Sequence, residues 1–282
     1  MGRTLLAVLA HPDDESFGMG GTLALYAHRG VDVFLVCATR GEAGEVDPKY
    51  LIGFTSIAER RESELRSASE HLGLKGVYFL NYRDSGMAGS PNNQHPQALI
   101  SQPIERVVAD VARHIRMLRP QVVITFDPIG GYRHPDHIAI HEATVQAFQM
   151  AADPALVLDG LEPYHPEKLY FYTIPHTIIR IAVNIMPIFG QDPRRMGKNK
   201  DIDLVSITNV RFPVHARINY RNVAKIRDEA SASHASQGGG GLLTGPVAYL
   251  RRMMASSETF MRAFPLPLSK IRIEKDLFDG VE

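Results

Sequence analysis

Residues 5–15 read Leu-Leu-Ala-Val-Leu-Ala-His-Pro-Asp-Asp-Glu, six apolar residues followed at once by an imidazole, a proline and three carboxylates. A short apolar run of this kind predicts a buried strand. A second cluster, residues 134–137 (His-Pro-Asp-His), follows the apolar run Val122–Phe126. In open α/β sheets the carboxyl ends of the strands are where functional sites form. Two such clusters at two strand ends predict one shared metal centre, and therefore an enzyme.

The first half of the chain alternates between strand-like and helix-like patterns. Apolar residues recur at helical spacing between the short apolar runs, and Gly30, Gly73 and Pro120 stand where the helices would end. This alternation predicts a Rossmann-like α/β fold, in which a mostly parallel sheet has helices on both faces. The predicted strands are 4–10, 31–39, 77–80 and 122–126.

The C-terminal third has a looser pattern. Strands are predicted at Lys168–Ile174 and Val205–Phe212, and a helix from about Asn219 to Ser233. The apolar segment Thr177–Phe189 could line the pocket, belong to the core or form an oligomer surface. Because the chain shows no internal repeat and no domain-sized linker, we expect one domain over residues 1–282, with a core at 1–153 and a C-terminal elaboration at 154–282.

The composition excludes several classes of partner. With 31 basic and 31 acidic residues the formal net charge is zero, so nothing favours nucleic acid or an anionic membrane. The single cysteine, Cys37, cannot form an intramolecular disulfide. The start of the chain lacks a signal-peptide pattern, and the segment 177–189 is too short to span a bilayer. We therefore expect a cytoplasmic protein, and a homo-oligomer is possible.

The residue types at the two strand ends match those of a catalytic metal site. His11 and Asp14 are three residues apart at a strand-to-helix junction, where one turn can direct both side chains at one ion, and His137 would add a third ligand. Two imidazoles and a carboxylate with an open fourth position form a catalytic zinc site, and they suit iron(II) as well. Asp13 is placed to take a proton from the attacking water.

His134 and Asp136 extend the predicted site. They are two residues apart, so the Asp136 carboxylate could hold the His134 ring in one tautomer. His134 could then donate a proton to the leaving group. Taken alone, Asp13 and Asp14 would be typical of a helix N-terminus, and the histidines could be polar loop residues. The joint occurrence after two apolar runs favours the metal site.

The two motifs resemble the zinc-dependent de-N-acetylases of the LmbE/PIG-L-like superfamily. The resemblance rests on residues 10–15 and 134–137, covers roughly residues 4–150, and extends more weakly to the region around His234. Residues 83–87 (Arg-Asp-Ser-Gly-Met) look most like the branch that acts on N-acetylglucosaminyl-inositol and mycothiol conjugates. Residues 41–45, 61–65 and 131–133 also match the pattern of the superfamily.

The resemblance implies a Rossmann-like fold and hydrolysis of an amide on a glucosamine nitrogen of a small amino-sugar substrate. It implies zinc held by His11, Asp14 and His137. It also implies Asp13 as the general base and His134 as electrophile or acid.

The same resemblance suggests roles for three further residues. Tyr132 would polarise the tetrahedral oxyanion. Arg61 and Asp84 would hold hydroxyl groups of the substrate. Each of the last two has a simpler alternative, since Arg61 could be a helix-surface charge paired with Glu64, and Asp84 could be an ordinary turn residue.

Three alternative functions remain. A nucleotide-binding oxidoreductase would need Gly-x-Gly-x-x-Gly after the first strand, whereas Gly18, Gly20 and Gly21 come too late and with the wrong spacing. A non-enzymatic metal- or sugar-binding protein would not need Asp13 and His134 beside the ligands. An amidase that cleaves a bulkier thiol conjugate belongs to the same reaction class as the deacetylase, and the sequence leaves the acyl group open.

Overall fold

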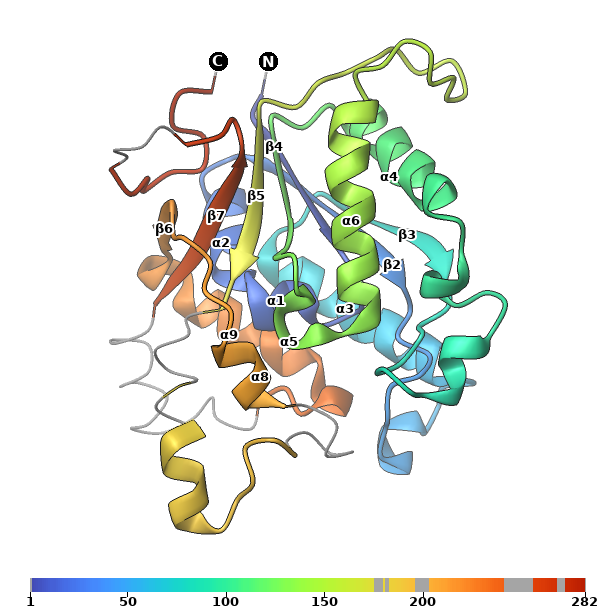
Figure 1. The fold of residues 1–282 in the computed structure, drawn as a ribbon, viewed down its shortest axis with the longest axis vertical. Helices are drawn as coiled ribbons and strands as arrows, with labels where there is room; N and C mark the ends of the chain where they lie inside the picture. Colours follow the sequence, from blue (N-terminus) through green and yellow to red (C-terminus); the bar gives the residue numbers. More distant parts are fainter. Residues whose placement is uncertain are drawn as a thin grey trace.

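A seven-stranded sheet lies at the centre of the computed structural model, which describes residues 2–174, 180, 183–195, 203–240, 256–267 and 272–281. The strand order is β3-β2-β1-β4-β5-β7-β6 (Figure 1). The strands are β1 (Thr4–Leu9), β2 (Asp32–Thr39), β3 (Gly76–Tyr82), β4 (Val122–Phe126), β5 (Lys168–Thr173), β6 (Ala216–Asn219) and β7 (Ser257–Phe264).

Five of these strands run parallel, as the sequence predicted. β1 pairs with β2 on one side and with β4 on the other, so that Leu5 lies opposite both Val33 and Val122. Every residue of β1 is buried, because helices cover both faces of a parallel sheet and its central strands are therefore apolar throughout. β7 runs antiparallel to β5 and to β6, which closes the sheet at one edge.

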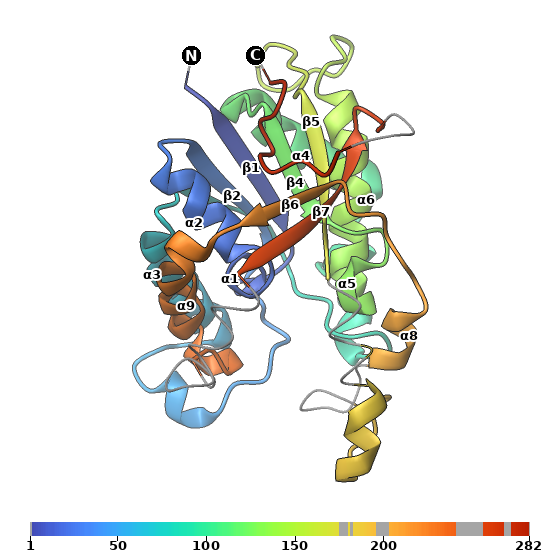
Figure 2. The same ribbon diagram turned by 90° about the vertical axis from the view of Figure 1, so that its left-hand side faces the viewer.

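Two helical layers cover the sheet. Figure 2 shows α4 and α6 on one face and α2, α3 and α9 on the other. The helices are α1 (Asp14–Gly18), α2 (Gly20–His28), α3 (Ile57–Leu72), α4 (Ile104–Leu118), α5 (Gly130–Arg133), α6 (Pro135–Met150), α8 (Leu204–Thr208) and α9 (Ala224–Ser233). Short 3-10 turns are η1 (Pro48–Leu51), η2 (Pro91–Gln94), η3 (Leu99–Ser101), η4 (Met186–Phe189), η5 (Arg221–Val223) and η6 (Ala235–Gln237).

The C-terminal third departs from the sequence prediction. The predicted strand Val205–Phe212 is wrong, because Leu204–Thr208 forms the short helix α8. The carboxylate of Asp203 accepts hydrogen bonds from the backbone N–H groups of Val205 (2.9 Å) and Ser206 (3.2 Å), which caps a helix at this point. Strands β6 and β7 were not predicted.

The segment Thr177–Phe189, expected to be pocket wall, core or oligomer surface, lies partly outside the described residues. Within its described part, Ile188 and Phe189 are exposed. Among the helices that the structure describes, none combines the length and apolarity needed to cross a bilayer. The single-domain organisation stays a prediction, although β6 and β7 belong to the same sheet as β1.

Glu258 of β7 connects the C-terminal third to helix α2. Its carboxylate accepts the backbone N–H groups of Gly21 (3.0 Å) and Thr22 (2.7 Å), which are free donors at the start of α2. Burial raises the pKa of Glu258 to about 7, against the opposing effect of the hydrogen bonds from Thr22 and Gly21. The folded protein therefore binds this proton more tightly than the unfolded chain.

This proton gives a testable pH dependence of stability. A carboxyl group whose pKa is raised on folding contributes stability that is complete below the unfolded pKa of about 4.5 and lost as pH rises through about 7. Chemical denaturation at pH 5 and pH 8 should therefore show a larger drop in unfolding free energy for the wild type than for Glu258→Gln, which has no proton to release. Equal drops in the two proteins would contradict this assignment.

Candidate active site

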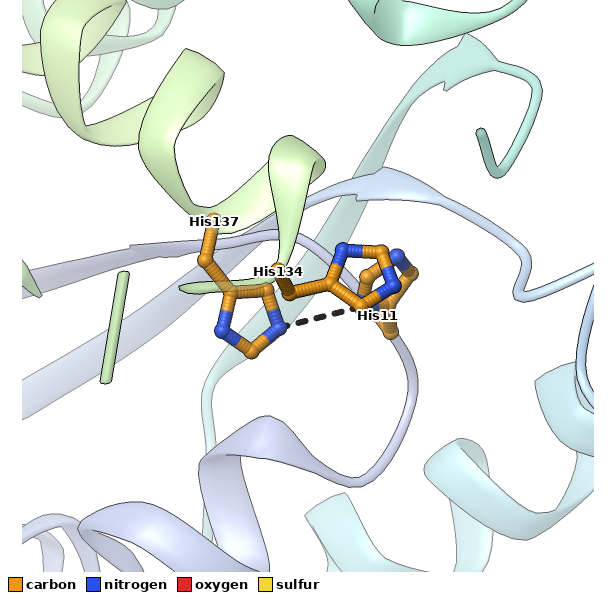
Figure 3. Close-up of side chains that lie close together, drawn as sticks. All are labelled: His11, His134 and His137. Atoms are coloured by element: carbon orange, nitrogen blue, oxygen red, sulfur yellow. Dashed lines mark hydrogen bonds between the residues drawn. The ribbon is translucent and has the colours of Figure 1, made fainter. Parts of the chain in front are cut away.

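The crossover of the chain places the two motifs side by side. The chain leaves β1 to build β2 and β3 on one side, and returns to build β4 and β5 on the other. The carboxyl ends of β1 and β4 therefore meet at the topological switch point of the sheet. His11 follows β1, while His134 and His137 lie at the start of α6, and the three rings face one another in Figure 3.

The three predicted metal ligands form a compact triangle. The Nδ1 atom of His11 lies 3.2 Å from Nε2 of His137 and 3.6 Å from Oδ2 of Asp14. Oδ1 of Asp14 lies 3.3 Å from Nε2 of His137. A tetrahedral ion with ligands at about 2.0–2.2 Å requires ligand atoms about 3.3–3.6 Å apart. The separations of the three residues, taken to the nearer Asp14 oxygen in each case, lie close to this range.

Hydrogen bonds leave the correct ring nitrogens free. Nδ1 of His137 donates to the carbonyl oxygen of Gly130 (3.1 Å), so Nε2 is available to an ion. Nε2 of His11 faces Oδ2 of Asp136 (3.1 Å) and Oδ1 of Asp84 (3.4 Å), to which it can donate, and its Nδ1 faces His137 and Asp14. Both imidazoles thus carry the carboxylate or carbonyl partner that fixes a metal-binding tautomer.

Asp14 enters this triangle as a carboxylate. Burial opposes ionisation of the group, but the rings of His137 and His11 hold its pKa well below the ordinary range. The ring nitrogens of His134, His11 and His137 also lie within 4.8 Å of one another. The Nδ1 atom of His134 accepts a backbone N–H, however, so Asp14 fits better than His134 as the third ligand.

The expected contact between Asp136 and His134 is not formed by the carboxylate. That carboxylate accepts from His11 and from the backbone N–H of Ser85 (2.9 Å). Instead, the backbone N–H of Asp136 donates to Nδ1 of His134 (3.2 Å), because His134 is the N-cap of α6. This bond leaves the proton of the neutral ring on Nε2. Burial, with the neighbouring His11 and His137, lowers the pKa of His134 to about 2.

Asp13 is held in a strained conformation. Its φ angle of 130° is rare for a residue other than glycine and costs about 1–3 kcal/mol. The backbone N–H of Asp13 donates to Oε2 of Glu15 (3.0 Å), and Nη2 of Arg61 donates to its Oδ2 atom (2.9 Å). Burial raises the pKa of Asp13 to about 6, while Arg61 acts in the opposite direction. The contacts with Glu15 and Arg61 fix the carboxylate beside the ligand triangle.

Comparison with protein families gives one match that covers both motifs of the site. Residues 6–148, about half of the chain, match the model of the PIG-L family, described as GlcNAc-PI de-N-acetylase. The chain belongs to the PIG-L family. Its members are enzymes that hydrolyse an amide bond, and this reaction class agrees with the prediction from the sequence.

Two curated relatives and one solved structure extend the comparison. The chain is 36% identical to a 1D-myo-inositol 2-acetamido-2-deoxy-alpha-D-glucopyranoside deacetylase of Geodermatophilus obscurus, over 83% of each chain. It is 43% identical to the protein of the same name from Kineococcus radiotolerans, over 67% of this chain but 57% of that one. N,N'-diacetylchitobiose deacetylase from Pyrococcus horikoshii shares the fold, with a TM-score of 0.62, 21% identity and coverage of 95% and 88%.

Arg61 and Asp84 lie deeper in this PIG-L site than the sequence suggested. The guanidinium of Arg61 is buried and donates to the carbonyl oxygens of Pro12 (2.7 Å) and Gly41 (3.1 Å) as well as to Asp13. A Cβ atom at Gly41 would clash with that guanidinium, which explains the glycine. Glu64 pairs with Arg60 (2.9 Å), so the alternative of an Arg61–Glu64 surface pair is wrong.

Asp84 lies behind His11. It accepts the backbone N–H of Gly86 (2.8 Å), and its Oδ1 atom is the one 3.4 Å from His11. The polar groups of Arg61 and Asp84, which were expected to bind substrate, thus form hydrogen bonds or close contacts within the protein. Arg61 contacts the predicted base, and Asp84 contacts a predicted ligand, so a direct contact of either with substrate stays a prediction.

A cavity of about 300 Å³ opens beside the ligand triangle. One wall is polar, because Asp13, Asp14 and His137 contribute to it, and the remainder is mainly apolar and aromatic. Burial raises the pKa of Tyr132 well above its ordinary value, so its phenol keeps its proton and can act as a donor. The lining residues are Asp13, Asp14, Phe17, Gly18, Met19, Phe126, Gly131, Tyr132, His137, Tyr172 and Ile174.

Two buried residues of the site had no assigned role in the sequence analysis. Glu15 was part of a motif only, and His234 was noted only for a weak resemblance. Both are 0% exposed, and Nε2 of His234 lies 2.7 Å from Oε1 of Glu15. They are 219 residues apart, so no local pattern could reveal this pair.

The ligand triangle predicts how metal content depends on single residues. After loading with zinc and gel filtration, His11→Ala and His137→Ala should each retain much less metal than the wild type, because two ligands remain of three. His114→Ala removes an imidazole of α4 that contacts the carbonyl oxygen of Asp110 and the ring of Tyr78 but none of the predicted ligands, and it should retain full metal. Elemental analysis measures this directly. Stoichiometric metal in both ligand variants would refute the assignment.

Proposed function

We propose that the chain is a zinc-dependent deacetylase that releases acetate from an N-acetylglucosaminyl-inositol. The observation that carries the proposal is the triangle of His11, Asp14 and His137 beside the carboxylate of Asp13, at the mouth of one cavity. The names of the relatives support the inositol-linked amino sugar as the substrate class. The ligand set suits iron(II) as well as zinc.

Asp14 and His137, two of the three residues that would hold the ion, line the cavity. When bound, a divalent ion polarises the amide carbonyl and lowers the pKa of a nearby water molecule. Asp13 takes a proton from the attacking water. Arg61 engages Oδ2 of Asp13, so Oδ1 is the oxygen that accepts this proton. The fixed carboxylate contributes orientation as well as basicity.

His134 acts as a neutral hydrogen-bond donor in this proposal. Its Nδ1 atom accepts the N–H of Asp136 at the positive end of α6, which disfavours a second proton on the ring. A neutral ring that gave its proton to the departing amine would become an anion. Of the two roles expected for His134, electrophile and acid, we therefore propose the electrophile. Nε2–H of His134 and the phenol of Tyr132 then stabilise the oxyanion, and Asp13 returns its proton to the amine.

The apolar part of the cavity favours a second candidate within the same reaction class. An acetyl methyl group occupies only a small fraction of about 300 Å³. Phe17, Phe126, Tyr172 and Ile174 could accommodate a larger acyl group, as an amidase of a bulkier thiol conjugate would require. Direct comparison of acyl groups on one sugar separates the two candidates.

The proposed function predicts the outcome of a substrate panel. Zinc-loaded protein should release amine from N-acetylglucosaminyl-inositol, and lengthening the acyl chain to butanoyl or hexanoyl should reduce kcat/KM. Asp13→Asn should keep its metal and lose about 10²–10⁴-fold in kcat, because an amide cannot take the proton. Faster release from the longer acyl chains would select the amidase. Absence of release from every substrate would refute both.

Asp84 gives a separate prediction about recognition. If it acts by holding His11, Asp84→Asn should reduce kcat/KM by about the same factor on the inositol-linked substrate and on free N-acetylglucosamine. If it contacts a substrate hydroxyl group, the substitution leaves that group unpaired, which costs about 1–3 kcal/mol. The loss in kcat/KM should then fall mainly on the substrate that makes the contact. The contacts in the structure favour equal losses, and unequal losses would restore the recognition role.

A further inference from the structure

The buried pair Glu15–His234 has no part in the chemistry described so far. Glu15 belongs to α1, and His234 follows α9 in the C-terminal third. Besides the 2.7 Å contact with His234, Oε1 of Glu15 accepts the hydroxyl group of Ser16. The ring of Phe17 packs edge-on against His234, with 5.7 Å between ring centres. A buried ionisable pair is seldom a source of net stability, so its geometry invites a functional explanation.

The other oxygen of Glu15 holds the predicted base. Oε2 accepts the backbone N–H of Asp13 at 3.0 Å, at the residue whose φ angle is 130°. A strained conformation persists only where the surroundings determine it more than once. Here Glu15 holds the main chain of Asp13, and Arg61 holds its carboxylate. His234 in turn contacts the other oxygen of the Glu15 carboxylate, Oε1.

We propose that His234 is a positioning residue that acts through Glu15 to hold Asp13 in its strained, working conformation. The inference rests on the proposed function of Asp13. Without its partner, the Glu15 carboxylate can turn away from the N–H of Asp13. The backbone of Asp13 then relaxes, and its carboxylate leaves the line of attack. Small displacements of a reacting group carry large rate penalties.

A second contact of the same C-terminal segment provides a matched control. The backbone N–H and hydroxyl group of Ser236 donate to Glu64 of α3, at 2.9 and 2.6 Å. Ser236→Ala therefore loosens the segment without removing a contact of Glu15. His234→Gln keeps a donor close to the position of Nε2, because an amide nitrogen replaces the ring nitrogen. His234→Ala removes the donor altogether.

Steady-state kinetics of the full-length, zinc-loaded variants tests the inference. We expect His234→Ala to lose about a hundredfold in kcat, with KM and metal content within about threefold of the wild type. The kcat of His234→Gln should be at least about tenfold higher than that of His234→Ala, and the kcat of Ser236→Ala should stay close to the wild-type value. Equal activity of His234→Ala and the wild type, a matching loss in Ser236→Ala, or a loss that follows metal content would overturn the inference.

Hydrogen exchange provides a readout that does not depend on turnover. The peptide that contains Asp13 should exchange faster in His234→Ala than in the wild type, and at the wild-type rate in His234→Gln. Unchanged exchange in His234→Ala would overturn the inference whatever the activity. If the wild type released no amine from any substrate, the proposed function would fail, and the exchange experiment would still decide whether His234 holds Asp13.

Discussion

The parallel pairing of β1 with β4 is the constraint on which the site depends. Leu5 of β1 lies opposite Val122 of β4, although 117 residues separate them in the chain. This register sets the ends of the two strands side by side, so that His11 and His137 approach within 3.2 Å. A register shift of one residue would turn the buried side chains of β1 to the opposite face and move His11 with them. The ion-binding geometry is therefore a property of the sheet.

Both ring nitrogens of His11 have partners at this junction of β1 and β4. Nδ1 of His11 belongs to the ligand triangle, and Nε2 faces the carboxylates of Asp84 and Asp136. Burial opposes protonation of His11, yet these carboxylates raise its pKa well above the ordinary value. Negative charge behind a ligand ring orients the ring and strengthens it as a donor to an ion. Acidic residues that first suggest catalysis can thus serve the ligand instead.

The sequence predicted the sheet well because continuous apolar runs define buried parallel strands. It brought His11, Asp14 and His137 together correctly, because all three residues follow strand ends that meet at one edge of the sheet, and their role as metal ligands stays a prediction. It failed where direction matters: spacing placed Asp136 near His134 but could not show that its carboxylate turns toward His11. Spacing also could not show that the buried guanidinium of Arg61 contacts Asp13, and a contact of Arg61 with substrate stays a prediction. The short alternation at Val205 looked like a strand because the capping effect of Asp203 is invisible to periodicity.

The long-range contacts have a consequence for building such a site in another scaffold. The whole ligand triangle comes from residues before 153, whereas His234 and Glu258 reach back from the C-terminal third to α1 and α2. A transplant of the two motifs onto a different parallel sheet would reproduce an ion-binding centre but not the distorted main chain at Asp13. Such a graft would capture metal and leave water largely unactivated. Under the two proposals above, metal binding depends on the first half of the chain alone, whereas hydrolysis also depends on the C-terminal third.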